Sequence, residues 1–180
     1  MTHRILGALA VRTVGWWLAT VAWAALIFYL STPAFAAHRS LPLLARLLAF
    51  FDVSLSPTTL GVLNSFIRTL AHLTEYAIFA LLLYRSCRGS TTLPAAGCLL
   101  PARCGWRPRL AFWCIVIAAV YSVTDEYHQS FTSTRGPSAF DCVLDTTGAA
   151  TGMLVAYFAV RFSSRQAPLI RRSRLTVNPT

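Results

Sequence analysis

The chain has 180 residues, of which 56% are hydrophobic and 12% are charged. This length suits a single domain, and the composition is too apolar for an ordinary soluble one. The net charge of +10 could indicate a nucleic-acid partner, but all sixteen basic residues are arginines placed as membrane topology requires, so we expect no nucleic acid.

The first apolar run, residues 14–34, is long enough for a membrane span, which needs roughly 20 mostly apolar residues. The alternative is a secretory signal, because two arginines precede the run and Ala-Phe-Ala follows at residues 34–36. We favour an uncleaved span, since the run is longer than a usual signal core. The next segment, LPLLARLLAFFDVSLSP at 41–57, is too short and interrupted to cross. We expect a short helix in the outer interface there, with a re-entrant segment as the alternative.

Three further spans are predicted at residues 62–84, 108–129 and 138–161. The loop between the second and third, SCRGSTTLPAAGCLLPARCGWRPR, contains three prolines and three glycines and should be irregular. The predicted fold is therefore all-α: an integral membrane four-helix bundle over residues 1–162. A basic tail, residues 163–180, should be disordered.

The arginines also predict the orientation of the spans. With both ends of the chain inside, twelve arginines lie in the cytoplasmic pieces and four in the outer pieces. Cytoplasmic loops of membrane proteins carry the excess of arginine and lysine. We therefore expect both the N-terminus and the C-terminus to be cytoplasmic.

Four of the six acidic residues lie in one stretch, TDEYHQSFTSTRGPSAFDCVLDTTG, between two apolar runs. In the predicted topology, the polar ends of the last three spans meet on the outer side. A carboxylate in hydrocarbon costs at least about 2.5 kcal/mol, so these groups must pair, protonate, bind a cation or line water. We expect them to share a polar pocket beneath the outer surface. The residues concerned are His72, Glu75, Tyr76, Asp125, Glu126, His128, Gln129, Arg135, Asp141 and Asp145.

Purely structural roles remain open for several of these residues. Asp141 follows a serine as S-x-x-D, a capping box for the fourth span. Arg135 could neutralise the neighbouring carboxylates, and His72 could be a hydrogen bonder between helices. Gly148 and Gly152 form a GxxxG pattern, which predicts the close approach of another helix.

The stretch VTDEYHQSFTSTRGPSAFDCVLDTTGAATG resembles the signature of the VanZ-like family, S-D-E-x-x-Q-x-F-x-x-x-R-x-x-x-x-x-D-x-x-x-N-x-x-G. LIFYLSTPA and LAHLTEYAIFALLLYR are similar to that family's first and second helices, so the resemblance spans residues 16–162. Asp145 stands where many members have asparagine. The positions that match are His72, Glu75, Tyr76, Asp125, Glu126, Gln129, Arg135, Asp141, Asp145 and Gly148.

The resemblance implies a small multi-pass protein of the bacterial plasma membrane, in a family named for resistance to the glycopeptide teicoplanin. The first functional hypothesis is binding of a membrane lipid or lipid-linked envelope molecule, with Tyr76, Gln129, Arg135, Asp141 and Asp145 as binding residues. The alternative is a membrane enzyme whose histidines and carboxylates perform acid–base or metal-assisted chemistry on an envelope lipid. Its candidate catalytic residues are His72, Glu75, Asp125, Glu126 and His128.

The sequence favours binding over catalysis, because no nucleophile motif stands out. We assign no cofactor-binding residues, the cofactor and the presence of a metal stay open, and a homo-oligomer is compatible with the sequence.

Overall fold

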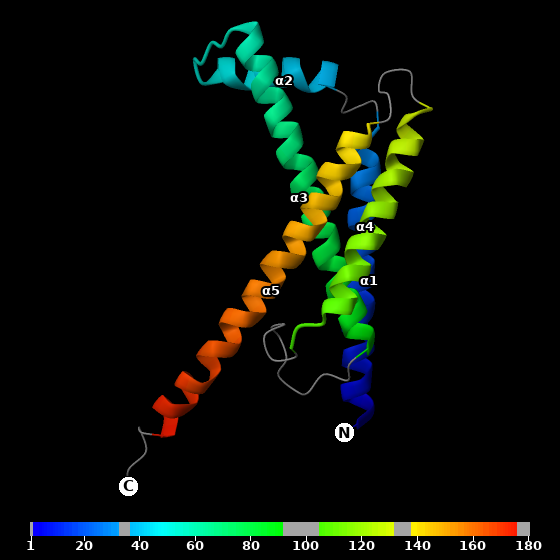
Figure 1. The fold of residues 1–180 in the computed structure, drawn as a ribbon, viewed down its shortest axis with the longest axis vertical. Helices are drawn as coiled ribbons and strands as arrows, with labels where there is room; N and C mark the ends of the chain where they lie inside the picture. Colours follow the sequence, from blue (N-terminus) through cyan, green and yellow to red (C-terminus); the bar gives the residue numbers. More distant parts are fainter. Residues whose placement is uncertain (1, 33–36, 92–104, 132–137, 176–180) are drawn as a thin grey trace.

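The computed structural model describes residues 2–32, 37–91, 105–131 and 138–175 (Figure 1). These residues form helices and no strand. Four helices contain stretches long and apolar enough to cross a membrane, which confirms the predicted all-α, four-span fold. The helices are α1 (Thr2–Leu30), α2 (Ala37–Phe50), α3 (Pro57–Thr91), α4 (Pro108–Gln129) and α5 (Ala139–Leu175).

Helices α3 and α5 are both longer than the sequence predicts. The segment 86–91 was expected to begin an irregular loop, yet it continues α3, because its first proline comes only after the helix has ended. Packing also holds this end: Ser86 is fully buried and its hydroxyl lies 2.8 Å from that of Thr20 on α1. Helix α5 runs past residue 162 to Leu175, through a segment that includes Pro168 but also four arginines and two leucines, which are good helix formers.

Helix α2 is the short helix expected between the first two spans. It lies crosswise to the long helices, at the end of the molecule opposite the two chain termini (Figure 1). Leu43, Leu47, Phe50 and the following Phe51 all expose most of their surface. A short helix with exposed apolar side chains and an orientation across the spans suits the membrane interface.

Helix α3 is the centre of the bundle and packs most extensively against α5. The two glycines of the GxxxG pattern lie at this contact, where a Cβ on Gly152 would be 2.5 Å from the carbonyl oxygen of Ala77. A Cβ on Gly148 would collide with the carbonyl oxygen of Leu73. The predicted close approach of a helix to these glycines is therefore confirmed.

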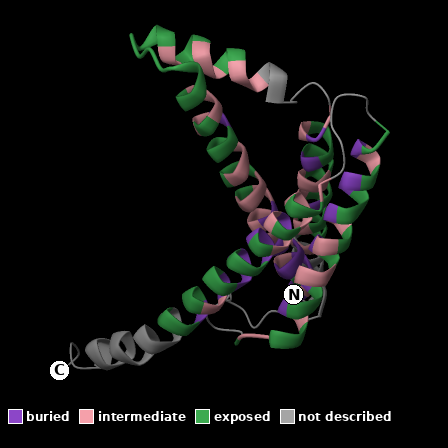
Figure 2. Cartoon of the chain, turned by 45° about the horizontal axis from the view of Figure 1, so that its top comes forward, coloured by how far each residue is buried: buried purple, intermediate pink, exposed green. Residues whose placement is uncertain are grey.

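Buried residues concentrate where the long helices cross, and the outer faces are exposed and largely apolar (Figure 2). The core contains Tyr76, Phe79 and Ala80 of α3, with Ala118 of α4 and Ala149 of α5. Beyond this crossing, α3 and α5 diverge towards the end that carries α2 (Figure 1). Apolar outer faces are expected for helices surrounded by lipid.

Candidate functional site

Asp145 of α5 is the centre of a buried polar cluster at the crossing of the helices. The residue is 1% exposed, and its side chain is contacted by two other spans. The Ser122 hydroxyl of α4 donates a hydrogen bond of 2.6 Å to Oδ2, and His72 Nδ1 of α3 lies 3.0 Å from Oδ1. The aspartate thus joins α3, α4 and α5 through both of its oxygens. His72 keeps 14% of its side chain exposed, which makes it the accessible member of this group.

Asp125 of α4 forms a second buried group with α1. The Ser31 hydroxyl at the end of α1 donates a hydrogen bond to Oδ2, and Gln129 Nε2 donates to the same oxygen at 3.1 Å. Asp125 is 4% exposed and Gln129 is fully buried. Both bonds give the buried Oδ2 atom hydrogen-bond partners, as burial of a polar group in an apolar environment requires.

Glu126 links the end of α4 to the start of α5 through a hydrogen bond. Its Oε2 accepts a hydrogen bond of 2.7 Å from the backbone N–H of Ser138, immediately before α5. The Ser138 hydroxyl in turn accepts a bond of 3.2 Å from the backbone N–H of Asp141, so Ser138 is the N-cap that the S-x-x-D pattern predicts. In a capping box the backbone N–H of Ser138 would donate a hydrogen bond to the side chain of Asp141. Here the side chain of Glu126, from the preceding helix, accepts that hydrogen bond instead.

Tyr76 is buried beside both aspartates. It is 1% exposed, and its ring packs against Phe79 and Tyr121 at centroid distances of 6.3 and 6.5 Å. The hydroxyl lies near Ser122, but no described residue meets it with good hydrogen-bond geometry. A buried hydroxyl of this kind ordinarily finds a partner, which can be a water molecule or a ligand.

The structure gives other predicted site residues different contacts. His128 packs on Phe28 of α1, with ring centroids 4.5 Å apart. Glu75 is half-buried, and its backbone carbonyl accepts a hydrogen bond of 3.0 Å from Trp23 Nε1. Arg135 lies outside the described residues. Among the residues that are described, no three histidine, cysteine or acidic side chains are grouped so as to hold a metal ion.

Ser122 is a site residue that the sequence analysis missed. The signal was the spacing of the buried face of α4, on which Ser122, Asp125 and Gln129 follow one another at helical intervals. The apolar residues of α4 do not show which of its faces is buried, because they lie on nearly all sides of the helix.

The face of α3 that carries His72 continues as a polar face towards α2. Arg68, Ser65 and Gly61 precede His72 at helical spacing, and Asn64 lies beside them. Nothing lies within 4 Å of the position that a Cβ on Gly61 would occupy, so this part of the face is open. The face is therefore open at its α2 end, at Gly61 and Ser65, and leads through the half-buried Arg68 to the His72–Asp145 pair.

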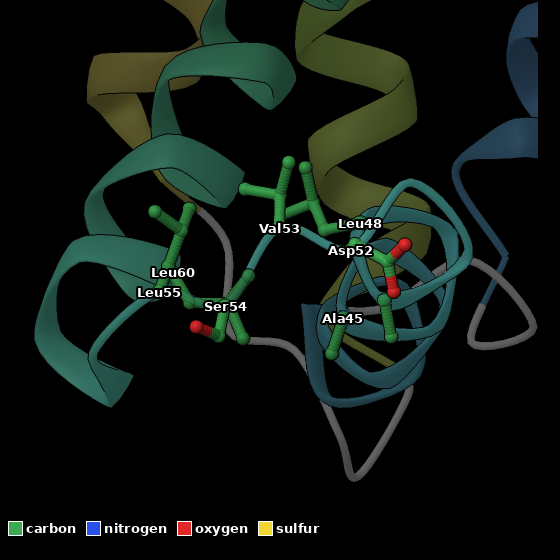
Figure 3. A pocket seen from close by; sticks show the side chains of 8 residues that line it. Ala45, Leu48, Asp52, Val53, Ser54, Leu55 and Leu60 are labelled. Carbon is green, nitrogen blue, oxygen red and sulfur yellow. The ribbon is translucent and has the colours of Figure 1, made fainter.

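A cavity of about 380 Å³ lies between α2 and the beginning of α3 (Figure 3). It is mostly apolar, with Asp52 and Ser54 as its polar side chains. Asp52 has a φ of 56°, the left-handed conformation with which the chain turns from α2 towards α3. None of the predicted site residues lines this cavity, so it is distinct from the polar cluster. Its lining consists of Ala45, Leu48, Ala49, Asp52, Val53, Ser54, Leu55 and Leu60.

Four long apolar helices around buried, hydrogen-bonded carboxylates define a multi-pass α-helical membrane protein. The model of the VanZ/LLP1 family matches residues 16–160, which is most of the chain, and the protein therefore belongs to that family. No curated protein and no solved structure shows significant similarity to the chain.

Proposed function

We propose that the protein lies in the bacterial plasma membrane with both termini in the cytoplasm and binds an amphiphilic envelope molecule at its α2 end. The observation that carries this proposal is the polar face of α3, which is open at its α2 end and leads to the His72–Asp145 pair. The arginine distribution supports the orientation, since it assigns the α2 end to the outer side.

The buried cluster is suited to hold a polar head group. Asp145 is fixed by Ser122 and His72, so it need not reorganise when a ligand arrives. The accessible edge of His72 can donate or accept a hydrogen bond, depending on its protonation. Tyr76 adds a buried hydroxyl next to the same aspartate. Polar and ionisable side chains cost free energy within a membrane, and those that are present usually serve a function.

Apolar side chains beside the polar face are suited to hold a hydrocarbon chain. Val62 and Phe66 of α3 are 67% and 59% exposed, and they lie on the face adjacent to His72. Leu43 and Leu47 extend the apolar surface along α2. An amphiphile could place its acyl chain along these residues while its head group reaches His72.

A lipoglycopeptide such as teicoplanin combines an acyl chain with a polar head, which matches the two parts of this surface. Family membership adds support, because the VanZ-like family is named for resistance to that compound. We therefore propose that the ligand is a lipoglycopeptide or a lipid-linked glycopeptide of the envelope.

Photo-crosslinking tests the proposal. The full chain in lipid nanodiscs would be exposed to teicoplanin carrying a diazirine on its acyl chain. We expect His72→Ala to reduce labelling about ten-fold, the loss of a hydrogen bond to a charged group. His128→Ala is the matched control, because that histidine packs on the ring of Phe28 on α1.

A second variant, Arg68→Gln, tests the same polar face without changing the buried pair. It should also reduce labelling while the protein keeps its unfolding temperature. Equal labelling of wild type, His72→Ala and Arg68→Gln would refute the proposed site.

A further inference from the structure

The chain turns from α2 into α3 through a short connection that is fixed at both ends. The backbone N–H groups of Asp52 and Val53 donate hydrogen bonds of 3.1 and 3.0 Å to carbonyl oxygens in the last turn of α2. With the positive φ of Asp52, these bonds form a Schellman motif. At the start of α3, the Ser56 hydroxyl accepts a hydrogen bond of 3.2 Å from the backbone N–H of Thr59, as an N-cap does.

Asp52 occupies the position of this motif at which glycine is usual. Its φ of 56° is unfavourable for a residue with a side chain, although aspartate adopts it more readily than most. The turn alone therefore does not account for a carboxylate here, because glycine would make the same turn at lower cost. The carboxylate lines the cavity between α2 and α3 (Figure 3) and is exposed, so a ligand can reach it. Within the described part of the chain, no side chain bonds to it.

The cavity brings this carboxylate together with apolar walls. Its volume of about 380 Å³ lies within the range of about 300–1,000 Å³ that is typical of small-ligand pockets. The walls include Leu48 of α2, Leu55 of the connection and Leu60 of α3, and the Ser54 hydroxyl is the second polar group. None of the eight lining residues is aromatic. Such a cavity matches a ligand that has a hydrocarbon part next to a cation with N–H donors.

The position of the cavity in the fold indicates where that ligand comes from. Helix α2 lies across the long helices and exposes Leu47 and Phe50, as a helix in the membrane interface does. The cavity between α2 and the start of α3 therefore lies at the depth where lipid head groups meet their acyl chains. A membrane lipid can reach it without leaving the bilayer.

We infer that this cavity binds phosphatidylethanolamine, with the lipid ammonium group on Asp52 and the first part of an acyl chain against Leu48 and Leu60. An ammonium is a compact charge with three N–H donors, and its hydrogen bonds to a carboxylate are charge-assisted. The quaternary ammonium of phosphatidylcholine has no N–H group and is recognised by aromatic cages, which this lining lacks. An anionic head group would be repelled by the carboxylate.

This lipid site is separate from the proposed envelope-ligand site. His72 lies about 18 Å further along the axis of α3 than Leu60, at a rise of about 1.5 Å per residue. Binding of the lipid rests on the α2–α3 connection alone. The two proposals can therefore fail independently.

The test uses the full chain in a neutral detergent and phosphatidylethanolamine with a photoreactive diazirine on one acyl chain. We expect saturable labelling that maps to residues 45–60, which carry the lining. Phosphatidylcholine and N-acetylated phosphatidylethanolamine should displace the probe about ten-fold less well than phosphatidylethanolamine, because neither has a charged N–H donor. Asp52→Asn should weaken binding of the probe by a similar factor. Asparagine also adopts the left-handed conformation, so the turn is kept.

A second pair of variants tests the walls of the cavity. Ala49→Leu places a larger side chain in the lining and should weaken labelling several-fold. Ala150→Leu makes the same change on the exposed face of α5 and should leave labelling intact. Equal labelling of wild type and Asp52→Asn would overturn the inference. So would displacement by phosphatidylcholine as effective as that by phosphatidylethanolamine, or labelling that maps outside the α2–α3 region.

Discussion

The contact of α5 with α3 makes a sharp prediction about Gly148. In Gly148→Ala, the added Cβ would meet three backbone atoms of Leu73, all within 3.0 Å. Backbone atoms of a packed helix cannot rotate away, so the two helices would have to separate by roughly 1 Å, and overpacking of this kind costs about 1–3 kcal/mol. Alanine recovers up to about 1 kcal/mol in helix propensity. We expect a net loss of about 1–2 kcal/mol.

The matched control is Gly15→Ala on α1. Nothing lies within 4 Å of its added Cβ, so only the gain in helix propensity applies. We expect Gly15→Ala to be neutral or more stable than wild type by up to about 1 kcal/mol. Both free energies of unfolding can be measured by titrating mixed micelles with a denaturing detergent. If Gly148→Ala proves as stable as Gly15→Ala, the α3–α5 contact described here is wrong.

Two other predictions concern the buried cluster and the orientation of the chain. Asp145→Ala should destabilise the protein by about 2–3 kcal/mol, because it removes the acceptor of the buried Ser122 hydroxyl and of the half-buried His72. Asp145→Asn should cost less, and equal losses in the detergent titration would argue against the bonds. In a chain without its native cysteines, Ser54→Cys should react with a membrane-impermeant maleimide added to intact cells, whereas Arg109→Cys should react only after lysis. The reverse pattern would exclude cytoplasmic termini.

Much of the architecture could be predicted from the sequence because the signals are local. An apolar run of sufficient length favours a membrane span whatever surrounds it. The short helix before α3, the serine cap of α5 and the small-residue face made by Gly148 and Gly152 likewise follow from residues close together in the chain. The end of α3 was harder to predict from the sequence, because the burial of Ser86 against Thr20 extends the helix beyond its apolar run.

The candidate site was predictable only in outline. The sequence places several carboxylates at similar depth, but the partners of Asp145 lie 73 and 23 residues away from it. Which side chains meet depends on the rotation of each helix about its own axis. A helix turns about 100° per residue, so an error of one residue exchanges Ser122 for Tyr121.

The sequence by itself determined the four spans and their polar ends, since transfer of an apolar segment into a bilayer depends on that segment alone. It also determined the family, which residues 16–160 match. The tertiary structure decided that Asp145 joins His72 and Ser122, that Glu126 rather than Asp141 completes the cap of α5, and that His128 faces Phe28. The reason is that close packing at Gly148 and Gly152 fixes how the helices are rotated, and this contact exists only after they have come together.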